Sequence, residues 1–401
     1  MNILFLTLSK FTSLDERNIY VDLVKELGSR GYKVYIVSPR QKREKLPTEL
    51  IDEGNIQILH VKTGNITKTK SFIEKGISTI LLESQYRKAI NKYFSNITFD
   101  MVIYSTPPIT FNKIIKYYKK SQNSKTYLML KDIFPQNAVD IEAMKKGSFI
   151  WKYFRDKEIE LYKLSDTIGA MSSENVNYVL SHNRYIDTNK LEVFPNAVKP
   201  ISRPKRTTKD KILLEKYGIP VDATLFIYGG NLGKPQGIDF LLQVIEEFYK
   251  VTNAYLLIVG DGTEYDRIEN FVRMKERKNV SILKRLPKVE YDKLMSNIDV
   301  GLIFLDERFT IPNFPSRITS YMENAVPVLA ATDVNTDVKN VLINSNSGFW
   351  CRSGDLKTFI SKAKILTNDR KLREKMGING RIYLEENYDI TQTVDILIKH
   401  L

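Results

Sequence analysis

The sequence predicts an α/β protein made of two Rossmann-like domains, each a doubly wound parallel sheet. Patterns of buried strand and amphipathic helix alternate along both halves of the 401 residues. A polar, proline-containing stretch, ISRPKRTTKDK at residues 201–211, separates the two series and is typical of a linker. A chain of this length also exceeds the usual size of one hydrophobic core. We therefore expect domains over 1–199 and 200–381, with a last helix at about 382–401 crossing back to the first.

The first half opens with a strand–helix–strand pattern. A buried strand at 3–8 is followed by helix-spaced apolar residues at 16–30, and a second strand at 33–38 ends before Pro39. Such an opening is typical of a parallel sheet, which binds ligands at the carboxyl ends of its strands. Further strands are expected at 56–61, 101–105, 127–130, 167–170 and 191–194, and helices at 71–94 and 151–164.

Two segments of this half follow strand ends and carry candidate ligand groups. Lys10, Thr12 and Glu16 lie in or beside the link after the first strand, which makes them candidates for binding an acceptor. Asp132 comes just after the strand at 127–130, where a catalytic or ligand-binding group belongs. An aspartate at this place could equally cap the following helix, and both roles stay open.

The second half restarts with strand, glycine-rich turn and helix in FIYGGNLGKPQGIDF, residues 226–240. This arrangement brings backbone N–H groups and a helix N-terminus up to a phosphate, and Lys234 adds a positive charge. A tight connection between strand and helix explains the same pattern without a ligand. Farther on, Pro315 and Ser316 predict a helix start, with Ser316 as the capping hydroxyl and Arg317 beside the unpaired N–H groups.

Composition excludes several classes of protein. A 42% hydrophobic and 27% charged chain is typical of a globular protein, and it has no apolar run long enough for a transmembrane helix. The start lacks the features of a signal peptide. One cysteine excludes an internal disulfide and a cysteine-built zinc site, and three histidines argue against a multi-histidine metal site, so we expect no metal and a cytoplasmic protein.

The net charge of +14 is concentrated in the first half, with +10 in residues 1–199 and +4 in the rest. A basic half suits an anionic partner: nucleic acid, acidic lipid or a diphosphate-linked substrate. No basic-aromatic motif for nucleic acid is present, so we expect no nucleic-acid partner. The helix at 71–94 is basic and could touch a membrane, although a helix that covers the sheet is the favoured interpretation.

Taken together these motifs resemble a GT-B glycosyltransferase of the retaining family 4 type. The resemblance is carried by FPNAV, IYGGNLGKPQGIDFLL, VGDGTEYDRI, KVEYDKLMSNIDVGLIFL and PSRITSYMENAVPVLA, in that order. YGGNLGKPQG and LKDIFPQNAV make it most similar to O-antigen and capsule transferases that add fucosamine-type sugars. The resemblance implies two domains facing a cleft, with the nucleotide sugar in the second domain and the acceptor in the first.

The resemblance also assigns residues. Asn231 stands where the family has its usual arginine, and Gln236, before Gly237, replaces its usual lysine, so Lys234 and Arg317 are assigned to the diphosphate instead. The family's glutamates fall on Pro312 and Ser320. The implied donor-binding set is Gly230, Asn231, Gln236, Gly237, Asp261, Gly262, Arg285, Leu286, Pro315, Ser316 and Ser320.

The implied chemistry needs neither metal nor cofactor beyond the nucleotide-sugar donor. Lys234, Arg317 and the helix N-termini would neutralise the charge that develops on the leaving diphosphate, which itself takes the acceptor proton in same-face attack. Asp132 matches an acidic residue that faces the transferred sugar, and we assign it to positioning and electrostatic stabilisation.

The expected function is transfer of an amino-deoxyhexose, such as N-acetyl-L-fucosamine, from a UDP-sugar to an undecaprenyl-diphosphate-linked sugar in capsule or O-antigen synthesis. The expected place is the cytoplasm, peripherally on the inner face of the cell membrane, with the oligomeric state open. Two alternatives stay open: a nucleotide-sugar 2-epimerase-like isomerase, and a non-catalytic subunit that binds a nucleotide sugar.

Overall fold

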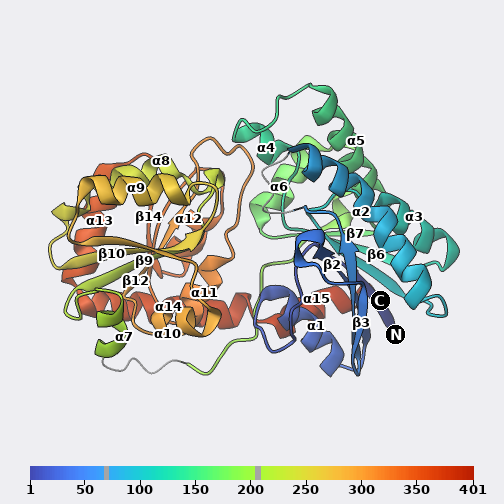
Figure 1. The fold of residues 1–401 in the computed structure, drawn as a ribbon, viewed down its shortest axis with the longest axis horizontal. Helices are drawn as coiled ribbons and strands as arrows, with labels where there is room; N and C mark the ends of the chain where they lie inside the picture. The colour runs from blue at the N-terminus through green and yellow to red at the C-terminus, as the bar shows by residue number, and fades with distance from the viewer. Residues whose placement is uncertain (67–71, 204–208) are drawn as a thin grey trace. The chain divides into compact units, whose positions relative to one another are not determined.

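The fold is α/β, as predicted from the sequence. The computed structural model describes residues 1–66, 72–203 and 209–401, and for residues 72–75 it describes the backbone alone. These residues form two sheets of parallel strands, each with helices on both faces (Figure 1). One sheet has an additional antiparallel strand at its edge.

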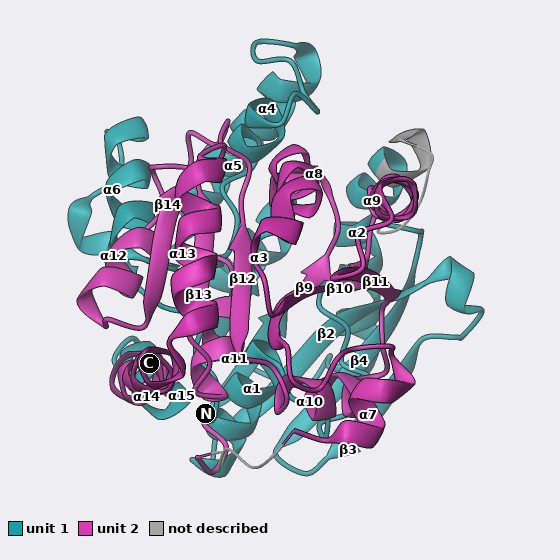
Figure 2. Ribbon diagram, turned by 90° about the vertical axis from the view of Figure 1, so that its left-hand side faces the viewer, with its two compact units in different colours: residues 1–199, 389–401 teal, residues 200–388 magenta. Residues whose placement is uncertain are grey.

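The chain divides into two compact units, which are coloured separately in Figure 2. Unit 1 consists of residues 1–199 and 389–401, and unit 2 of residues 200–388. The chain therefore returns to unit 1 after Tyr388, later than the position near 382 expected from the sequence. The reason is that one helix, α14 (Arg370–Asn387), continues through that position and belongs to unit 2.

The sheet of unit 1 has the strand order β3-β4-β2-β1-β5-β6-β7-β8. Its central strand β1 pairs in parallel with both neighbours, so that Leu6 lies opposite Val37 and Tyr104 and the carboxyl ends of the strands lie along one edge. The strands are β1 (Asn2–Leu6), β2 (Lys33–Gln41), β3 (Glu49–Glu53), β4 (Ile56–Thr63), β5 (Met101–Ser105), β6 (Lys125–Leu130), β7 (Thr167–Ala170) and β8 (Leu191–Val193).

Most of the strands expected in the first half are present, and the edge strand β3 is an addition. Its sequence, ELIDE, is mostly charged and its side chains are half-buried or exposed, which is why no buried-strand pattern marks it. The helices of this unit are α1 (Ile19–Ser29), α2 (Phe72–Tyr93), α3 (Asn112–Ser121), α4 (Gln136–Asp140), α5 (Phe149–Leu164), α6 (Ser173–His182) and α15 (Ile390–Ile398).

Helix α2 covers the sheet, which confirms the favoured interpretation of the segment at 71–94. It packs against β4 and α3, and its buried side chains include Leu82, Tyr86 and Ile90. Ser71 and the nearby Lys68 and Lys70 lie outside the described residues. Three apolar side chains of α2 nevertheless face solvent: Ile77, Ile80 and Leu81.

The sheet of unit 2 is parallel throughout, in the order β11-β10-β9-β12-β13-β14. In Figure 1 its helices α8, α9 and α13 lie on one face, and α10, α11 and α14 on the other. The strands are β9 (Thr224–Asn231), β10 (Ala254–Asp261), β11 (Val280–Lys284), β12 (Val300–Phe304), β13 (Val328–Thr332) and β14 (Gly348–Arg352). The remaining helices are α7 (Lys211–Lys216), α8 (Ile238–Glu247), α9 (Tyr265–Lys275), α10 (Lys288–Met295), α11 (Arg317–Glu323), α12 (Val338–Asn344) and α13 (Leu356–Asn368).

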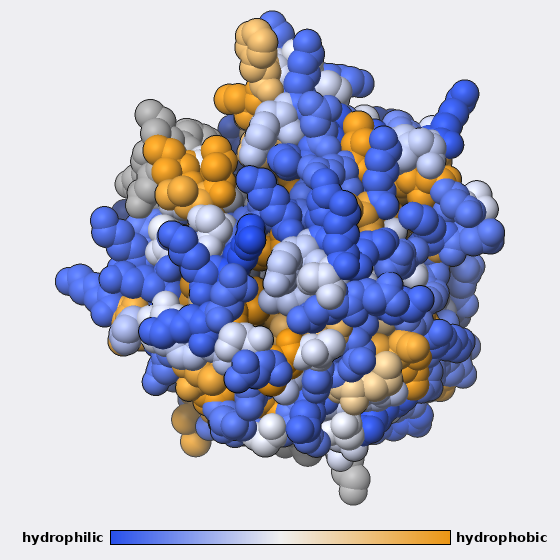
Figure 3. Space-filling view, turned by 90° about the vertical axis from the view of Figure 1, so that its right-hand side faces the viewer, coloured by the Kyte–Doolittle hydropathy of each residue, from blue (hydrophilic) through white to orange (hydrophobic). Residues whose placement is uncertain are grey.

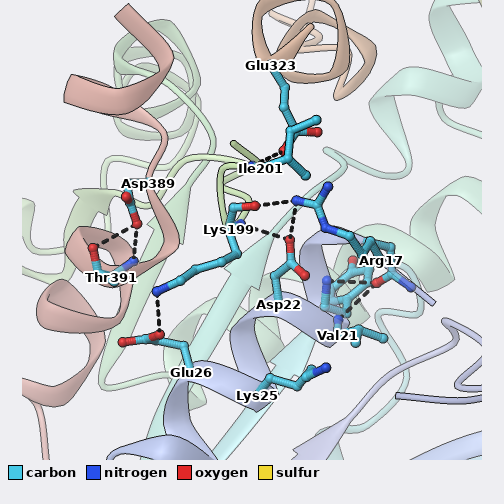
Figure 4. A network of polar contacts seen from close by, with 12 residues as sticks. Arg17, Val21, Asp22, Lys25, Glu26, Lys199, Ile201, Glu323, Asp389 and Thr391 are labelled. Atoms are coloured by element: carbon cyan, nitrogen blue, oxygen red, sulfur yellow. Dashed lines mark hydrogen bonds and ion pairs between the residues drawn. The ribbon is translucent and has the colours of Figure 1, made fainter. Parts of the chain in front are cut away.

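The two places where the chain leaves and re-enters unit 1 are tied together by backbone pairing. Val198 forms a parallel bridge with Asp389, and the Ile390 N–H donates to the Val198 carbonyl at 3.0 Å. Next to this bridge, the Lys199 N–H donates to Asp22 at 2.9 Å and its Nζ lies 3.4 Å from Glu26, as Figure 4 shows. Lys199, the last residue of unit 1 before the chain enters unit 2, is thus fixed to α1.

The return of the chain completes the core of unit 1. Side chains of α15, including Ile390, Val394 and Leu397, belong to the same buried cluster as Ile3 and Phe5 of β1. Residues from the two ends of the sequence therefore share one hydrophobic core.

Candidate functional site

The carboxyl ends of β9 and β10 bring the predicted glycine-rich turns together. Gly230 lies opposite Gly260, and Asn231 lies opposite Asp261 in the parallel register. The Leu232 N–H donates to the Asp261 carbonyl at 3.0 Å, which holds the two turns backbone to backbone. A Cβ at Gly262 would lie 2.2 Å from the Leu232 carbonyl oxygen, so this position requires glycine.

Arg317, the first residue of α11, reaches across to this edge. Its Cζ lies 4.5 Å from the centre of the Tyr228 ring, and its Nη2 donates to Gln236 Oε1 at 2.8 Å. A Cβ built on Gly230 would lie 3.2 Å from Nη2, so the guanidinium lies directly against the glycine turn. Its Nη1 is buried and has no hydrogen-bond partner among the described residues. A buried N–H donor without a partner favours an anionic ligand at this position.

Gln236 holds Arg317 without neutralising it. Its Oε1 accepts hydrogen bonds from both Arg317 and the Tyr228 hydroxyl, the latter at 3.2 Å. Lys234, the other predicted cation, is exposed and makes no contact with a described residue that would bring it into this group. The structure therefore brings together Arg317, Gln236 and Gly230, and leaves Lys234 on the surface beside them.

Gly237, the N-cap residue before α8, has a left-handed conformation, with φ at 56°. A Cβ there would lie 2.8 Å from the Leu305 carbonyl oxygen, so that a larger residue would be both strained and in collision. The glycine thus lets the N-terminus of α8 follow the turn closely.

The predicted cap of α11 is wrong. Ser316 stands at the N-cap, but its side chain makes no capping hydrogen bond, and its carbonyl accepts from the Thr319 hydroxyl instead. Pro315 precedes it, and the half-buried Ser320 lies one turn into the same helix. These residues are neighbours of Arg317 in the chain, and we assign the binding of an anionic ligand to Arg317 itself.

Arg285 and Leu286 follow β11, whose last residue, Lys284, lies opposite Gly260. They are therefore at the same sheet edge as Asp261, one strand beyond β10. The Arg285 side chain is exposed and Leu286 is half-buried.

In unit 1, Asp132 follows β6 at the carboxyl edge of the sheet. Asn137 Nδ2 donates to both of its carboxylate oxygens, at 2.7 and 2.6 Å. Thr106, at the end of β5, accepts from the Lys131 and Asp132 N–H groups at 3.0 and 3.2 Å. The capping alternative for Asp132 is wrong, because α4 starts at Gln136 and is preceded by Pro135.

The ionisable groups at this edge have pKa values near neutrality. Burial raises the pKa of Asp132 to about 6, against the lowering effect of its hydrogen bonds from Asn137. Burial also lowers the pKa of the neighbouring Lys131 to about 7, and its Nζ lies 3.4 Å from the Phe194 carbonyl oxygen. Perturbed groups at a strand end favour a functional site at Asp132.

The three residues proposed to bind an acceptor follow β1 and form no hydrogen bond or ion pair with Asp132 or Lys131 among the described residues. Lys10 forms an ion pair with Glu44 at 2.8 Å, and Thr12 and Glu16 are exposed. Sequence reasoning missed Thr106, Asn137 and Tyr228, because a neutral side chain that orients a charged one has no sequence signature of its own.

Within the part of the chain that the structure describes, no three histidine, cysteine, aspartate or glutamate side chains are grouped so that they could hold a metal ion. None of the described helices is both long and apolar enough to span a bilayer.

Comparison with known proteins bears on both units. Residues 209–383 match the family model described as "Glycosyl transferases group 1". The chain is 22% identical over 292 residues to a probable glycosyltransferase, WbjE, of Pseudomonas aeruginosa, a match covering 72% of this chain and 71% of that protein. It is 24% identical over 261 residues to the capsular polysaccharide biosynthesis glycosyltransferase CapM of Staphylococcus aureus, covering 64% and 66% of the two chains.

Solved structures share the fold over the whole chain. Sucrose-phosphate synthase from Thermosynechococcus elongatus superposes with a TM-score of 0.76 at 15% identity, covering 100% of this chain and 98% of that one. HepE from Anabaena, solved in complex with UDP and glucose, superposes with a TM-score of 0.70 at 13% identity and full coverage of both chains. The two sheets together form the GT-B fold expected from the resemblance.

Proposed function

We propose that the protein transfers a sugar from a nucleoside-diphosphate donor to an acceptor in polysaccharide synthesis, because residues 209–383 match the family model described as "Glycosyl transferases group 1". The edge formed by β9, β10 and α11 binds the donor, and the carboxyl edge of β6 supplies Asp132.

The observation that carries this proposal is the position of Arg317. Its buried Nη1 lacks a partner among the described residues, and its guanidinium lies against the Gly230 turn. A diphosphate oxygen at this place would accept a hydrogen bond from the free N–H group. It would also face a full positive charge, since Tyr228 and Gln236 are both neutral. As the bond to the sugar breaks, that charge would stabilise the leaving diphosphate.

Asp132 is proposed to position and stabilise the transferred sugar. With a pKa of about 6 it is largely ionised at neutral pH, and Asn137 fixes both of its oxygens. A fixed carboxylate would stabilise the positive charge that develops on the sugar ring in the transition state. Retention of configuration and a reaction without metal are part of the proposal.

The finer identity of the substrates rests on the relatives and on the resemblance of the motifs. A capsular polysaccharide transferase among the relatives supports a role in capsule or O-antigen synthesis, and a UDP-bound neighbour supports UDP as the leaving group. We propose N-acetyl-L-fucosamine or a similar amino-deoxyhexose as the sugar, and a sugar linked to undecaprenyl diphosphate as the acceptor. Such an acceptor would place the protein peripherally on the inner face of the cell membrane.

The experiment that tests the proposal is calorimetric titration of the pure protein with UDP, GDP, ADP and dTDP. We expect selective binding of UDP, and much weaker binding by Arg317→Gln than by Arg317→Lys, which keeps the charge. A protein that bound none of the four nucleotides at micromolar concentration would refute the donor site.

A further inference from the structure

The start of α5 exposes more apolar surface than any other helix start with described side chains. Phe149 is 92% exposed and Ile150 63%, and Tyr153 on the same helix is 41% exposed. We call residues 145–153 the α5 tip. In Figures 1 and 2 it lies at the end of unit 1 away from the two termini, next to α4. Figure 3 shows apolar groups in the upper part of this side of the molecule, set in hydrophilic surface.

The local structure holds these side chains outward. Ser148 caps the helix by accepting from the Trp151 N–H at 3.2 Å, and its own N–H donates to the Lys145 carbonyl at 3.2 Å. One turn farther along α5, Phe154 packs edge-on against Phe134, with 5.0 Å between the ring centroids. The cap and this ring contact fix the first turns of α5, on which Phe149 and Ile150 are exposed.

Positive charge surrounds the exposed apolar pair. Lys145, Lys146 and Lys152 are exposed and form no ion pair with a described residue, and residues 141–153 contain one acidic residue, Glu142. Farther along α5, Lys157 lies 2.9 Å from Glu160, and Arg155 pairs with Glu158. The α5 tip therefore combines apolar side chains with unneutralised lysines, which complement an apolar layer bordered by anionic headgroups.

We propose that the α5 tip docks the protein on an anionic lipid bilayer, with Phe149 and Ile150 inserted at the level of the headgroups and the three lysines on lipid phosphates. This proposal rests on the proposed function and adds a membrane-binding surface to it, since an acceptor linked to a lipid diphosphate lies in such a bilayer. Vesicle binding and nucleotide binding can be measured separately, which keeps the failure of one distinct from the failure of the other.

The test is flotation of the full chain with two kinds of vesicle. One is phosphatidylcholine alone, and in the other about one lipid in three is phosphatidylglycerol, which gives a negative surface potential. We expect binding to the anionic vesicles, and a loss of at least tenfold for Phe149→Ser/Ile150→Ser. Ile212→Ser in unit 2, at 82% exposed, is the matched control and should bind like the wild type. Lys145→Gln/Lys146→Gln/Lys152→Gln should lose binding in the same way, whereas Lys357→Gln/Lys364→Gln/Lys371→Gln, which changes three other exposed lysines, should not.

Three outcomes would overturn the proposal. The first is wild-type protein that floats with neither vesicle, and the second is protein that floats equally with both and without dependence on salt. The third is a Phe149/Ile150 variant that binds anionic vesicles as well as the Ile212 control does, which would move any membrane contact to another surface, such as Ile77, Ile80 and Leu81 of α2. In each case UDP titration of the same variant shows whether the donor site is intact.

Discussion

At each of the two sheet edges a neutral carboxamide holds a charged side chain, and the two charges have opposite signs. In unit 2 a cation, Arg317, is held by the amide oxygen of Gln236; in unit 1 an anion, Asp132, is held by the amide nitrogen of Asn137. Neither charge is paired with an opposite charge in the contacts described. Elsewhere the buried arginines do pair, as Arg381 does with Glu385. A neutral carboxamide orients an ionic group while leaving its charge for a ligand.

The two edges differ in how their charge responds to pH. The arginine stays protonated at any pH the protein tolerates, whereas burial brings the pKa of Asp132 to about 6. Donor binding should therefore be insensitive to the protonation of the protein, while the transfer step should depend on it. Substitutions at the two edges can separate these effects.

The largest effect is expected for Asp132→Asn. It keeps the size of the side chain and removes its charge, so kcat should fall on the order of 10²-fold or more. The Kd for UDP should change by less than about twofold, because the residue lies in unit 1. Initial rates and calorimetry on the same preparation measure both quantities. Equal losses in rate and in UDP binding would break the proposed division of roles, and an unchanged rate would exclude Asp132 from the transfer step.

Next in size is Arg317→Gln, which should weaken UDP binding by about 10- to 100-fold, the value of one or two hydrogen bonds to a charged group. Uridine, which has no phosphate, should bind as it does to the wild type. The double variant Gln236→Lys/Arg317→Gln places a lysine in the turn, at the position where the family has its usual lysine. It should recover part of the lost affinity. If it binds no better than Arg317→Gln alone, the two positions do not serve the same phosphate.

The acid limb of the pH–rate profile is the next test. Since protonation removes the Asp132 charge, kcat/KM should decrease as the pH falls through about 6. The hydrogen bonds from Asn137 lower this pKa, so Asn137→Leu should move the limb to higher pH. A limb that stays at the same pH in Asn137→Leu would assign it to another group.

Protein stability should respond to the same carboxylate with the opposite trend. The folded state keeps the Asp132 proton above the ordinary pKa of 3.8, so this group costs stability as the pH rises from about 4 to 6. Replacing it with asparagine should therefore raise Tm more at pH 7 than at pH 4. Thermal unfolding at the two pH values measures this difference; equal shifts would show that the pKa is not raised.

The smallest effect is expected for Lys10→Met. The ion pair with Glu44 is on the surface, and exposed pairs stabilise proteins by about 0–1 kcal/mol. Unfolding should change by no more than this, and UDP binding should not change. A large increase in KM for the acceptor with an unchanged Kd for UDP would instead support the role predicted for Lys10 from the sequence.

The sequence predicts the parallel sheets well because their strands are continuous apolar runs. Met101–Ser105, for instance, is a strand with the bounds expected from the pattern. The charged edge strand β3 and the half-buried β14 have no such run and were not expected. Strand ends also predicted where Asp132 and Gly230 would lie. The side chains that hold the two charges belong to other elements. Whether they come into contact depends on tertiary packing, which no local sequence pattern predicts.

The shared core of unit 1 has a consequence for biosynthesis. Its strand β1 leaves the ribosome before unit 2 is synthesised, while Ile390, Val394 and Leu397 of the same core leave after unit 2. Unit 2, by contrast, is one continuous segment and can fold while the chain is still being made. Unit 2 should thus finish folding before unit 1. A chain truncated before residue 389 would contain a complete unit 2 attached to an incomplete unit 1.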